Sequence, residues 1–264
     1  MEPRHLPTST SGLKRLRGVI FDYGNTLVRL DPSVRSTRTD YADVVARPGA
    51  ERLRAFLARS GALADRHEAF VGRFLEVRER NRRLAEESGR EITALQSLRE
   101  TLLDLKLAVA SGADLEAGLT EFFLPEVELL RPMPGAEALL TVLRERGLRI
   151  AMLSNATCGR TIADVTGRMG WTGFFDPLVV SADIGVRKPC PEAFRSVLDP
   201  WDLDTGEVAM VGDSLYHDVG GARALGLITV HFAAIPNPFD AAVVDSVGPA
   251  YSVSSHEELR LLFM

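Results

Sequence analysis

The stretch from Gly18 to Leu27 reads GVIFDYGNTL, and it decides the fold class. Three consecutive apolar residues, Val19 to Phe21, are typical of a strand that is buried on both faces of a parallel sheet. The run ends abruptly at Asp22, and Gly24 and Thr26 follow it. Because parallel α/β folds bind ligands at the carboxyl ends of their strands, Asp22 is the first candidate functional residue.

Strands and helices alternate in the carboxyl-terminal half of the chain. Apolar runs predict strands at residues 149–153, 178–180, 208–211 and 228–232. Helical patterns with turn and cap residues at their ends predict helices at 136–146, 219–225 and 255–262. This alternation implies a parallel sheet with right-handed crossovers. We therefore predict an α/β fold, a Rossmann-like parallel sheet core with an inserted helical cap domain.

The segment from Asp31 to Arg131 has a different composition, rich in Leu, Ala, Arg and Glu. Its apolar residues recur with helical spacing, as in Phe70, Phe74 and Val77, and the segment is long enough for about four helices. It interrupts the sheet after the first strand. We expect a core of residues 16–30 and 132–264, a cap of residues 31–131, and a flexible tail at 1–15.

Composition excludes several classes of protein. The chain has 264 residues and a net charge of −5, which argues against a general nucleic-acid binder because phosphate backbones select basic surfaces. Two cysteines are too few for a disulfide framework in a chain of this length. No apolar run approaches the ~20 residues that a membrane span needs, and the first residues lack a signal peptide's apolar core. We expect a cytoplasmic protein, monomeric or homodimeric, that binds neither nucleic acid nor membrane.

Polar residues gather at or near the ends of the predicted strands. They are Asp22, Ser154 with Asn155, Lys188, and Asp213 with Asp218. Carboxylates that converge on one point raise one another's pKa unless a cation is present. Oxygen ligands in small number suit Mg²⁺, which keeps several waters and meets substrate phosphates. A lysine and a hydroxyl beside that metal would neutralise phosphoryl oxygens.

Four short motifs in this order resemble those of the haloacid dehalogenase (HAD) superfamily. They are FDYGNTLV from Phe21, LSN from Leu153, the lysine of GVRKPCPEAF from Gly185, and VGDSLYHDVGGARALG from Val211. Any one of them is a weak signal, but the four agree in order and spacing from about Leu16 onward. The resemblance implies a hydrolase whose small helical cap, of the C1 type, selects substrates and excludes water on closing.

The resemblance also implies roles for the residues that handle phosphate. Asp22 would attack phosphorus and form an aspartyl-phosphate, which splits one hard displacement into two easier steps. Thr26 would orient the loop that carries Asp22. Ser154 and the backbone N–H of Asn155 would hold phosphoryl oxygens, and Lys188 would balance the charge of nucleophile and substrate. The expected substrate is a small phosphorylated metabolite.

A second set of residues would hold the metal. The resemblance implies that Asp22, the carbonyl of Gly24 and Asp213 bind Mg²⁺. Asp218 would hold Lys188 or a metal-bound water in the second shell.

Gly24 departs from the family pattern. Phosphatases of this superfamily carry an aspartate there, two residues after the nucleophile, which protonates the leaving group and later activates water. Such general acid–base help is typically worth 10²–10⁴-fold. One interpretation is a phosphatase that acts on a leaving group of low pKa. Another acid is the alternative, and His217 is a candidate, whereas Tyr23 and Asn25 should point away from this position in an extended segment.

Other chemistries remain open at this stage. The dehalogenase branch has a different residue at this position and needs no metal, whereas Asp213 and Asp218 indicate a retained metal site. The phosphonate-cleaving branch needs a Schiff-base lysine in the cap, and Lys106 is the only lysine there. A further alternative is a non-catalytic relative that binds a phosphorylated ligand or a partner.

Overall fold

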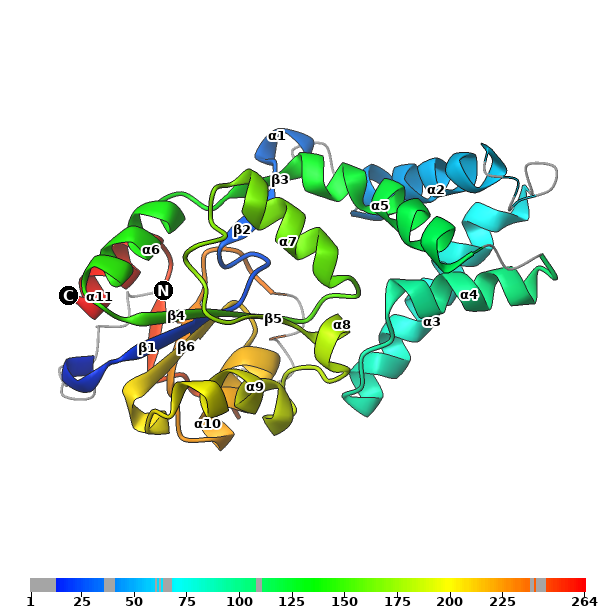
Figure 1. Ribbon diagram of the computed structural model, residues 1–264. Helices are drawn as coiled ribbons and strands as arrows, with labels where there is room; N and C mark the ends of the chain where they lie inside the picture. Colours follow the sequence, from blue (N-terminus) through cyan, green and yellow to red (C-terminus); the bar gives the residue numbers. More distant parts are fainter. Residues whose placement is uncertain are drawn as a thin grey trace. The chain divides into compact units, whose positions relative to one another are not determined.

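The computed structural model describes residues 13–35, 41–59, 61, 63, 68–107, 111–237, 240 and 246–264. The chain divides into two compact units, an α/β unit and a helical unit (Figure 1). The α/β unit comprises the chain up to Arg29 with residues 132–155 and 166–264, and the helical unit comprises 30–131 with 156–165. Most of the predicted flexible tail lies outside the described residues, and its last part, Leu13–Arg15, forms the 3₁₀ turn η1.

The α/β unit is built on a six-stranded parallel sheet, in the order β5-β4-β1-β6-β7-β8. Its strands are β1 Gly18–Phe21, β4 Arg149–Ser154, β5 Leu178–Val180, β6 Val208–Gly212, β7 Ile228–Phe232 and β8 Tyr251–Val253. The predicted α/β fold is confirmed. The edge strand β8 was not predicted, because three residues that alternate between buried and exposed give too short a pattern.

Helices cover both faces of this sheet (Figure 1). They are α6 Ala136–Glu145, α8 Ser181–Ile184, α9 Pro191–Trp201, η3 Thr205–Glu207, η4 Leu215–Gly220, α10 Gly221–Ala224 and α11 His256–Phe263. Ile20 on the central strand packs with Phe194 and Trp201 of α9 in one apolar cluster. The predicted helix at 219–225 is confirmed for the most part as α10, and a π-helical turn, η4, precedes it and extends the helical segment back to Leu215. Ser255 caps α11 as predicted, accepting a hydrogen bond from the Glu258 N–H.

The helical unit is an α-helical assembly with its own apolar core. Its elements are α1 Pro32–Arg35, η2 Ala42–Ala46, α2 Arg47–Arg59, α3 Ala69–Ser88, α4 Ala94–Asp104 and α5 Gly112–Leu129. Residues of α2, α3, α4 and α5, among them Leu53, Phe74, Leu98 and Phe122, form one buried cluster. Helix α7, Gly159–Arg168, begins in this unit. The four long helices match the number predicted, while the cap limits at 31 and 131 stay a prediction.

The chain passes between the two units at a small two-stranded sheet. Its strands are β2 Val28–Leu30 and β3 Leu130–Pro132. Two of the four unit boundaries, 29/30 and 131/132, fall within or beside these strands. Residues 30–131 therefore form an insertion whose first and last residues belong to paired strands.

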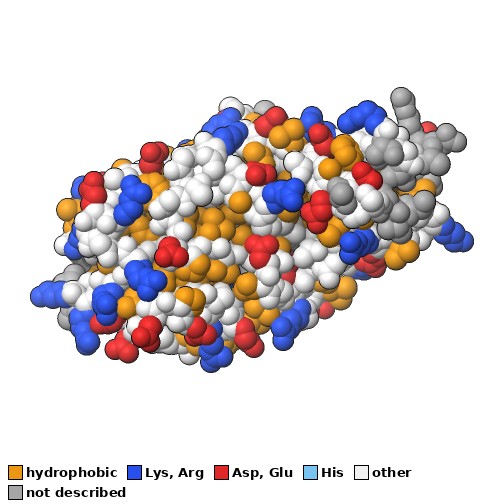
Figure 2. Space-filling model, viewed as in Figure 1, with side chains coloured by type: hydrophobic (Ala, Val, Ile, Leu, Met, Phe, Trp, Pro, Cys, Tyr) orange, Lys and Arg blue, Asp and Glu red, His pale blue; other side chains and the backbone are white. Residues whose placement is uncertain are grey.

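Charged side chains of both signs are interspersed on the face shown in Figure 2. On the helical unit, Arg52 pairs with Glu121 and Arg82 with Glu79, and all four side chains are substantially exposed. Exposed pairs of this kind contribute little to stability, and these arginines lie on solvent-exposed faces of their helices. No helix among the described residues is long and apolar enough to cross a membrane.

Candidate active site

Two adjacent strands deliver carboxylates to the same edge of the sheet. Asp22 follows β1, and Asp213 follows β6, which pairs with β1 in parallel with Phe21 beside Val211. The N–H of Asp22 continues this ladder by donating to the Val211 carbonyl at 2.8 Å. The predicted convergence of Asp22 and Asp213 therefore follows from strand register alone.

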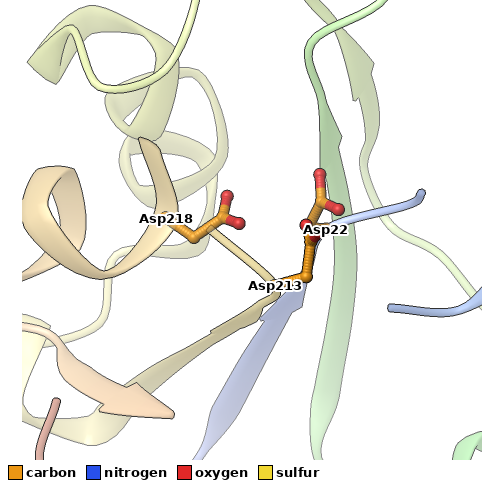
Figure 3. A group of neighbouring side chains, drawn as sticks. All are labelled: Asp22, Asp213 and Asp218. Carbon is orange, nitrogen blue, oxygen red and sulfur yellow. The ribbon is translucent and has the colours of Figure 1, made fainter. Parts of the chain in front are cut away.

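Lys188 and Asp218 complete a buried charged cluster with these two residues. The Lys188 ammonium donates to Asp22 Oδ1 and to Asp218 Oδ1, each at 2.7 Å, and the lysine is 2% exposed. Carboxylate oxygens of Asp22, Asp213 and Asp218 all lie within 4.8 Å of one another, beyond the end of β1 (Figure 3). One ammonium group is thus bonded to two of the three carboxylates, Asp22 and Asp218.

Burial and mutual repulsion perturb these carboxyl groups. Burial raises the pKa of Asp22 from 3.8 to about 6, against the attraction of Lys188 and with a further contribution from Asp218. Burial likewise raises the pKa of Asp213 to about 8, and the charges of Asp22 and Asp218 add to the rise. Burial lowers the pKa of Lys188, but the two aspartates outweigh it and the net shift is upward. A divalent cation would relieve this shortage of positive charge, so the donor set fits Mg²⁺.

Gly212 is required for Asp218 to reach the cluster. A Cβ on residue 212 would lie 2.2 Å from Asp218 Oδ2 and 2.3 Å from its carboxyl carbon. Asp218 Oδ2 also accepts a hydrogen bond from the Ser214 N–H at 3.0 Å. Both oxygens of Asp218 are therefore engaged inside the protein, one by Lys188 and one by the backbone.

Asn155 has a role that sequence analysis did not assign. Its side-chain amide donates to the Lys188 carbonyl at 2.9 Å and accepts from the Lys188 N–H at 2.8 Å. This reciprocal pair fixes the backbone from which the Lys188 ammonium is presented. Ser154, the last residue of β4, is buried at the same edge of the sheet.

Comparison with known proteins identifies the family of this chain. The family model of haloacid dehalogenase-like hydrolases matches residues 16–226. The chain belongs to this family. It is 34% identical over 116 residues to the glyceraldehyde 3-phosphate phosphatase of Pyrococcus abyssi, a match that covers 44% of this chain and 48% of that protein. The chain spans about half the length of the curated relatives that it matches first.

Solved structures of the family share the fold. A 2-haloacid dehalogenase from Pseudomonas syringae superposes with a TM-score of 0.61 at 21% identity, over 94% of this chain and 97% of the other. The HAD-hydrolase YfnB from Bacillus subtilis, solved bound to magnesium, gives 0.58 at 22% identity over 94% and 99%. At this identity the likeness concerns the fold, and dehalogenases and magnesium-bound members share it alike.

Gly24 of this hydrolase has open space where a side chain would stand. It is exposed, and no atom lies within 4 Å of a Cβ built on it. Its φ is not in the left-handed region, so the backbone does not require glycine. Neither packing around a Cβ nor backbone strain explains the glycine.

Asn25 does not behave as the sequence predicted. We expected an extended segment with its side chain turned away, but Asn25 has a φ of 55°, and its amide donates to Asp213 Oδ2 at 3.3 Å. Asparagine adopts the left-handed conformation more readily than most residues. Thr26 next to it is fully buried, and its hydroxyl has no hydrogen-bond partner in the described part of the chain. Its predicted role in orienting the loop therefore stays a prediction.

The loop after β7 supplies residues that sequence analysis missed. Asn237 donates a second amide hydrogen bond to Asp213 Oδ2 at 3.3 Å, and Asp240 Oδ1 accepts from the Leu215 N–H at 2.8 Å. His231 Nε2, on strand β7 itself, lies 3.3 Å from Asp240 Oδ2 and 3.2 Å from the Asp213 carbonyl oxygen. Because β7 neighbours β6, polar residues just after it were a usable signal for the same sheet edge.

Two candidates considered from the sequence are not drawn into the cluster. The ring of His217 contacts Ser214 within its own turn, with Ser214 Oγ 3.1 Å from Nδ1. Lys106 is exposed just after α4, with a φ of 53°. A Schiff-base lysine requires a desolvated pocket, whereas Lys106 is exposed among the residues that the structure describes.

Proposed function

We propose that this hydrolase is a Mg²⁺-dependent phosphatase with a C1-type cap, and that it acts on a small phosphorylated metabolite through an aspartyl-phosphate on Asp22. The buried Lys188, bonded at 2.7 Å to Asp22 beside two further carboxylates, carries this proposal. An anionic substrate is repelled by the carboxylate that must attack it, and an ammonium bonded to that carboxylate offsets this repulsion. The phosphatase relative from Pyrococcus abyssi supports the same class of substrate.

Asp22 would act as the nucleophile. One of its carboxylate oxygens attacks phosphorus while the bond from phosphorus to the leaving oxygen breaks, and water then cleaves the aspartyl-phosphate. Lys188 holds Asp22 in place and would neutralise a phosphoryl oxygen. The Ser154 hydroxyl and the Asn155 N–H would bind the remaining oxygens, while the Asn155 side chain holds Lys188.

Magnesium would be held by Asp22, Asp213 and the carbonyl of Gly24. Asp218 stays in the second shell, because its two oxygens already accept from Lys188 and the Ser214 N–H. When bound, the ion supplies positive charge that stabilises the phosphoryl group in the transition state. Asn25 and Asn237 both donate to Asp213 Oδ2, which leaves Oδ1 of that residue for the ion.

Glycine at position 24 restricts the substrate. It offers a carbonyl but no proton, so the leaving group departs without the usual acid. We therefore expect the best substrates to have leaving groups of low pKa, such as acyl or anomeric phosphates. His217, held in its own turn, is not our choice for a substitute acid.

A second candidate function, non-catalytic binding, would also be consistent with glycine at position 24. A non-catalytic relative that binds a phosphorylated ligand or a partner would have no need of the acid. The intact cluster of Asp22, Lys188 and Asp213 favours the enzyme. The cluster also disfavours a metal-free dehalogenase, and the exposure of Lys106 disfavours a phosphonate-cleaving enzyme. Monomeric or dimeric state and cytoplasmic location stay predictions.

A Mg²⁺-dependent phosphate-release assay tests the proposal. Wild type, Asp22→Asn and Gly24→Asp are compared on acyl phosphates, sugar phosphates and nucleotides. We expect wild type to release phosphate best from acyl phosphates, and Asp22→Asn to release none. Gly24→Asp should gain about 10²–10⁴-fold on alkyl phosphates, whose leaving groups need protonation. Phosphate release by Gly24→Asp alone would support the binding protein, and activity that survives in Asp22→Asn would refute the mechanism.

A further inference from the structure

The carboxylate of Asp213, a proposed magnesium ligand, is held asymmetrically. Its Oδ2 accepts amide hydrogen bonds from Asn25 and Asn237, each at 3.3 Å. Its Oδ1 accepts no hydrogen bond in the part of the chain that the structure describes. One oxygen of this carboxylate is therefore fixed by the protein, and the other is open.

A second set of contacts holds the backbone of the same residue. His231 on β7 pairs with Gly212 on β6, so the register places it one residue from Asp213. Its Nε2 lies 3.2 Å from the Asp213 carbonyl oxygen and 3.3 Å from Asp240 Oδ2. Carbonyl and carboxylate oxygens are acceptors, so Nε2 must carry the ring hydrogen to bond either of them.

Asp240 joins these contacts to the turn that follows Asp213. Its Oδ1 accepts from the Leu215 N–H at 2.8 Å, and its own N–H donates to the Asn237 carbonyl at 3.2 Å. One short segment thus supplies both the amide on Asp213 and the carboxylate beside His231. The side chains of His231 and Asp240 are only 16% and 13% exposed, so water competes little for these contacts.

A carboxylate with a single open oxygen suits Mg²⁺ better than Ca²⁺. Mg²⁺ demands near-octahedral coordination at short distances, whereas Ca²⁺ takes about six to eight oxygens and often binds both oxygens of one carboxylate. Groups that hydrogen-bond a metal ligand orient it, and their loss typically costs about 10–100-fold in metal affinity. The contacts around Asp213 are of this kind, and they leave only its Oδ1 for an ion.

We propose that Asn237 and His231 are positioning residues that hold Asp213 with Oδ1 alone toward the metal, and that they thereby favour Mg²⁺ over Ca²⁺. Asp240 links the two. This inference rests on the proposed function and deepens it by naming the residues that select the ion. Without the Asn237 amide, only Asn25 would restrain Oδ2, and that second oxygen would become available to the larger ion.

Calorimetric titration of Mg²⁺ and of Ca²⁺ into the metal-free protein tests this assignment without any substrate. Asn237→Leu removes the amide, His231→Leu removes the Nε2–H, and His231→Gln keeps an amide N–H in its place. The control is Thr229→Val, also on β7, whose hydroxyl accepts from the Ala250 N–H at 2.9 Å. Urea unfolding in EDTA establishes that each variant is folded.

We expect Asn237→Leu to lower the affinity for Mg²⁺ by about 10–100-fold and the affinity for Ca²⁺ by less, so that the preference for Mg²⁺ falls. His231→Leu should act in the same direction, and His231→Gln should recover most of the loss. Thr229→Val should lower the stability in EDTA and leave both metal affinities unchanged, as expected for a purely structural residue.

Equal losses of the two affinities in Asn237→Leu, or no loss of either, would overturn the assignment. A loss in His231→Gln as large as that in His231→Leu would overturn the role of the Nε2–H. If His231→Leu does not fold, Asn237→Leu decides alone. The proposed function fails separately: a wild type that binds Mg²⁺ but releases phosphate from no substrate would refute the phosphatase and leave this test of the metal ligand intact.

Discussion

Asp213→Asn should stabilise the metal-free protein at pH 8, although it removes a proposed magnesium ligand. The folded-state pKa of Asp213 is about 8 against 3.8 for an unperturbed aspartate, so the folded state binds its proton more tightly than the unfolded state. Stability from such a group is fully present below pH 3.8 and is lost as pH rises toward 8. Asparagine has no charge to lose, and its stability should not fall over this range.

The size of the effect follows from the pKa shift. A difference of about 4 units at about 1.4 kcal/mol per unit gives roughly 5 kcal/mol of folding free energy lost between pH 4 and pH 8. Asp22, whose pKa is about 6, contributes about 3 kcal/mol in the same direction. The two charges repel each other, so neutralising Asp213 also relieves Asp22. We expect a gain of a few kcal/mol for Asp213→Asn at pH 8.

Urea unfolding in EDTA between pH 4 and pH 8 measures this gain. Both tryptophans of the chain, Trp171 and Trp201, are buried in the α/β unit, so their fluorescence reports the unit that holds the site. Asp199→Asn, on an exposed position of α9, is the matched control and should change little at any pH. Mg²⁺ should restore wild type at pH 8 and leave Asp213→Asn unchanged. Equal stability of wild type and Asp213→Asn at pH 8 in EDTA would refute the electrostatic reasoning.

Two further substitutions test the cluster. Gly212→Ala should lower kcat by about 10–1,000-fold and the free energy of unfolding by about 1–3 kcal/mol, because its Cβ would displace Asp218 from Lys188. Steady-state kinetics measures the first effect and urea unfolding the second. A variant with the wild-type kcat would contradict the role of Asp218. Lys188→Met should lower the free energy of unfolding by about 3–5 kcal/mol at pH 7 without Mg²⁺, because it leaves the two buried carboxylates of Asp22 and Asp218 without their ammonium partner. If urea unfolding gives the same loss at pH 4, packing rather than charge is responsible.

The fold and half of the site were predictable because their signals are local. A continuous apolar run such as Val19 to Phe21 identifies a buried parallel strand, and parallel strands put their carboxyl ends on one edge. Asp22 and Asp213 had to meet there once β1 and β6 were neighbours. Asp218 was also foreseeable, because a helical turn after a strand end points its first residues back toward that edge.

The remaining contacts depend on loop conformations that no local pattern encodes. Alternation in an extended segment would turn Asn25 away from the site, and a single left-handed residue reverses the outcome. Asn237 reaches Asp213 from a loop 24 residues further along.

Gly24→Asp should act on kcat, which tests the missing acid directly. An acid at position 24 would act only as the bond to the leaving group breaks, so Gly24→Asp should raise kcat and leave KM unchanged. The gain should be large on alkyl phosphates and small on acyl phosphates, whose leaving groups depart without protonation. An equal gain on both classes of substrate would contradict the leaving-group argument.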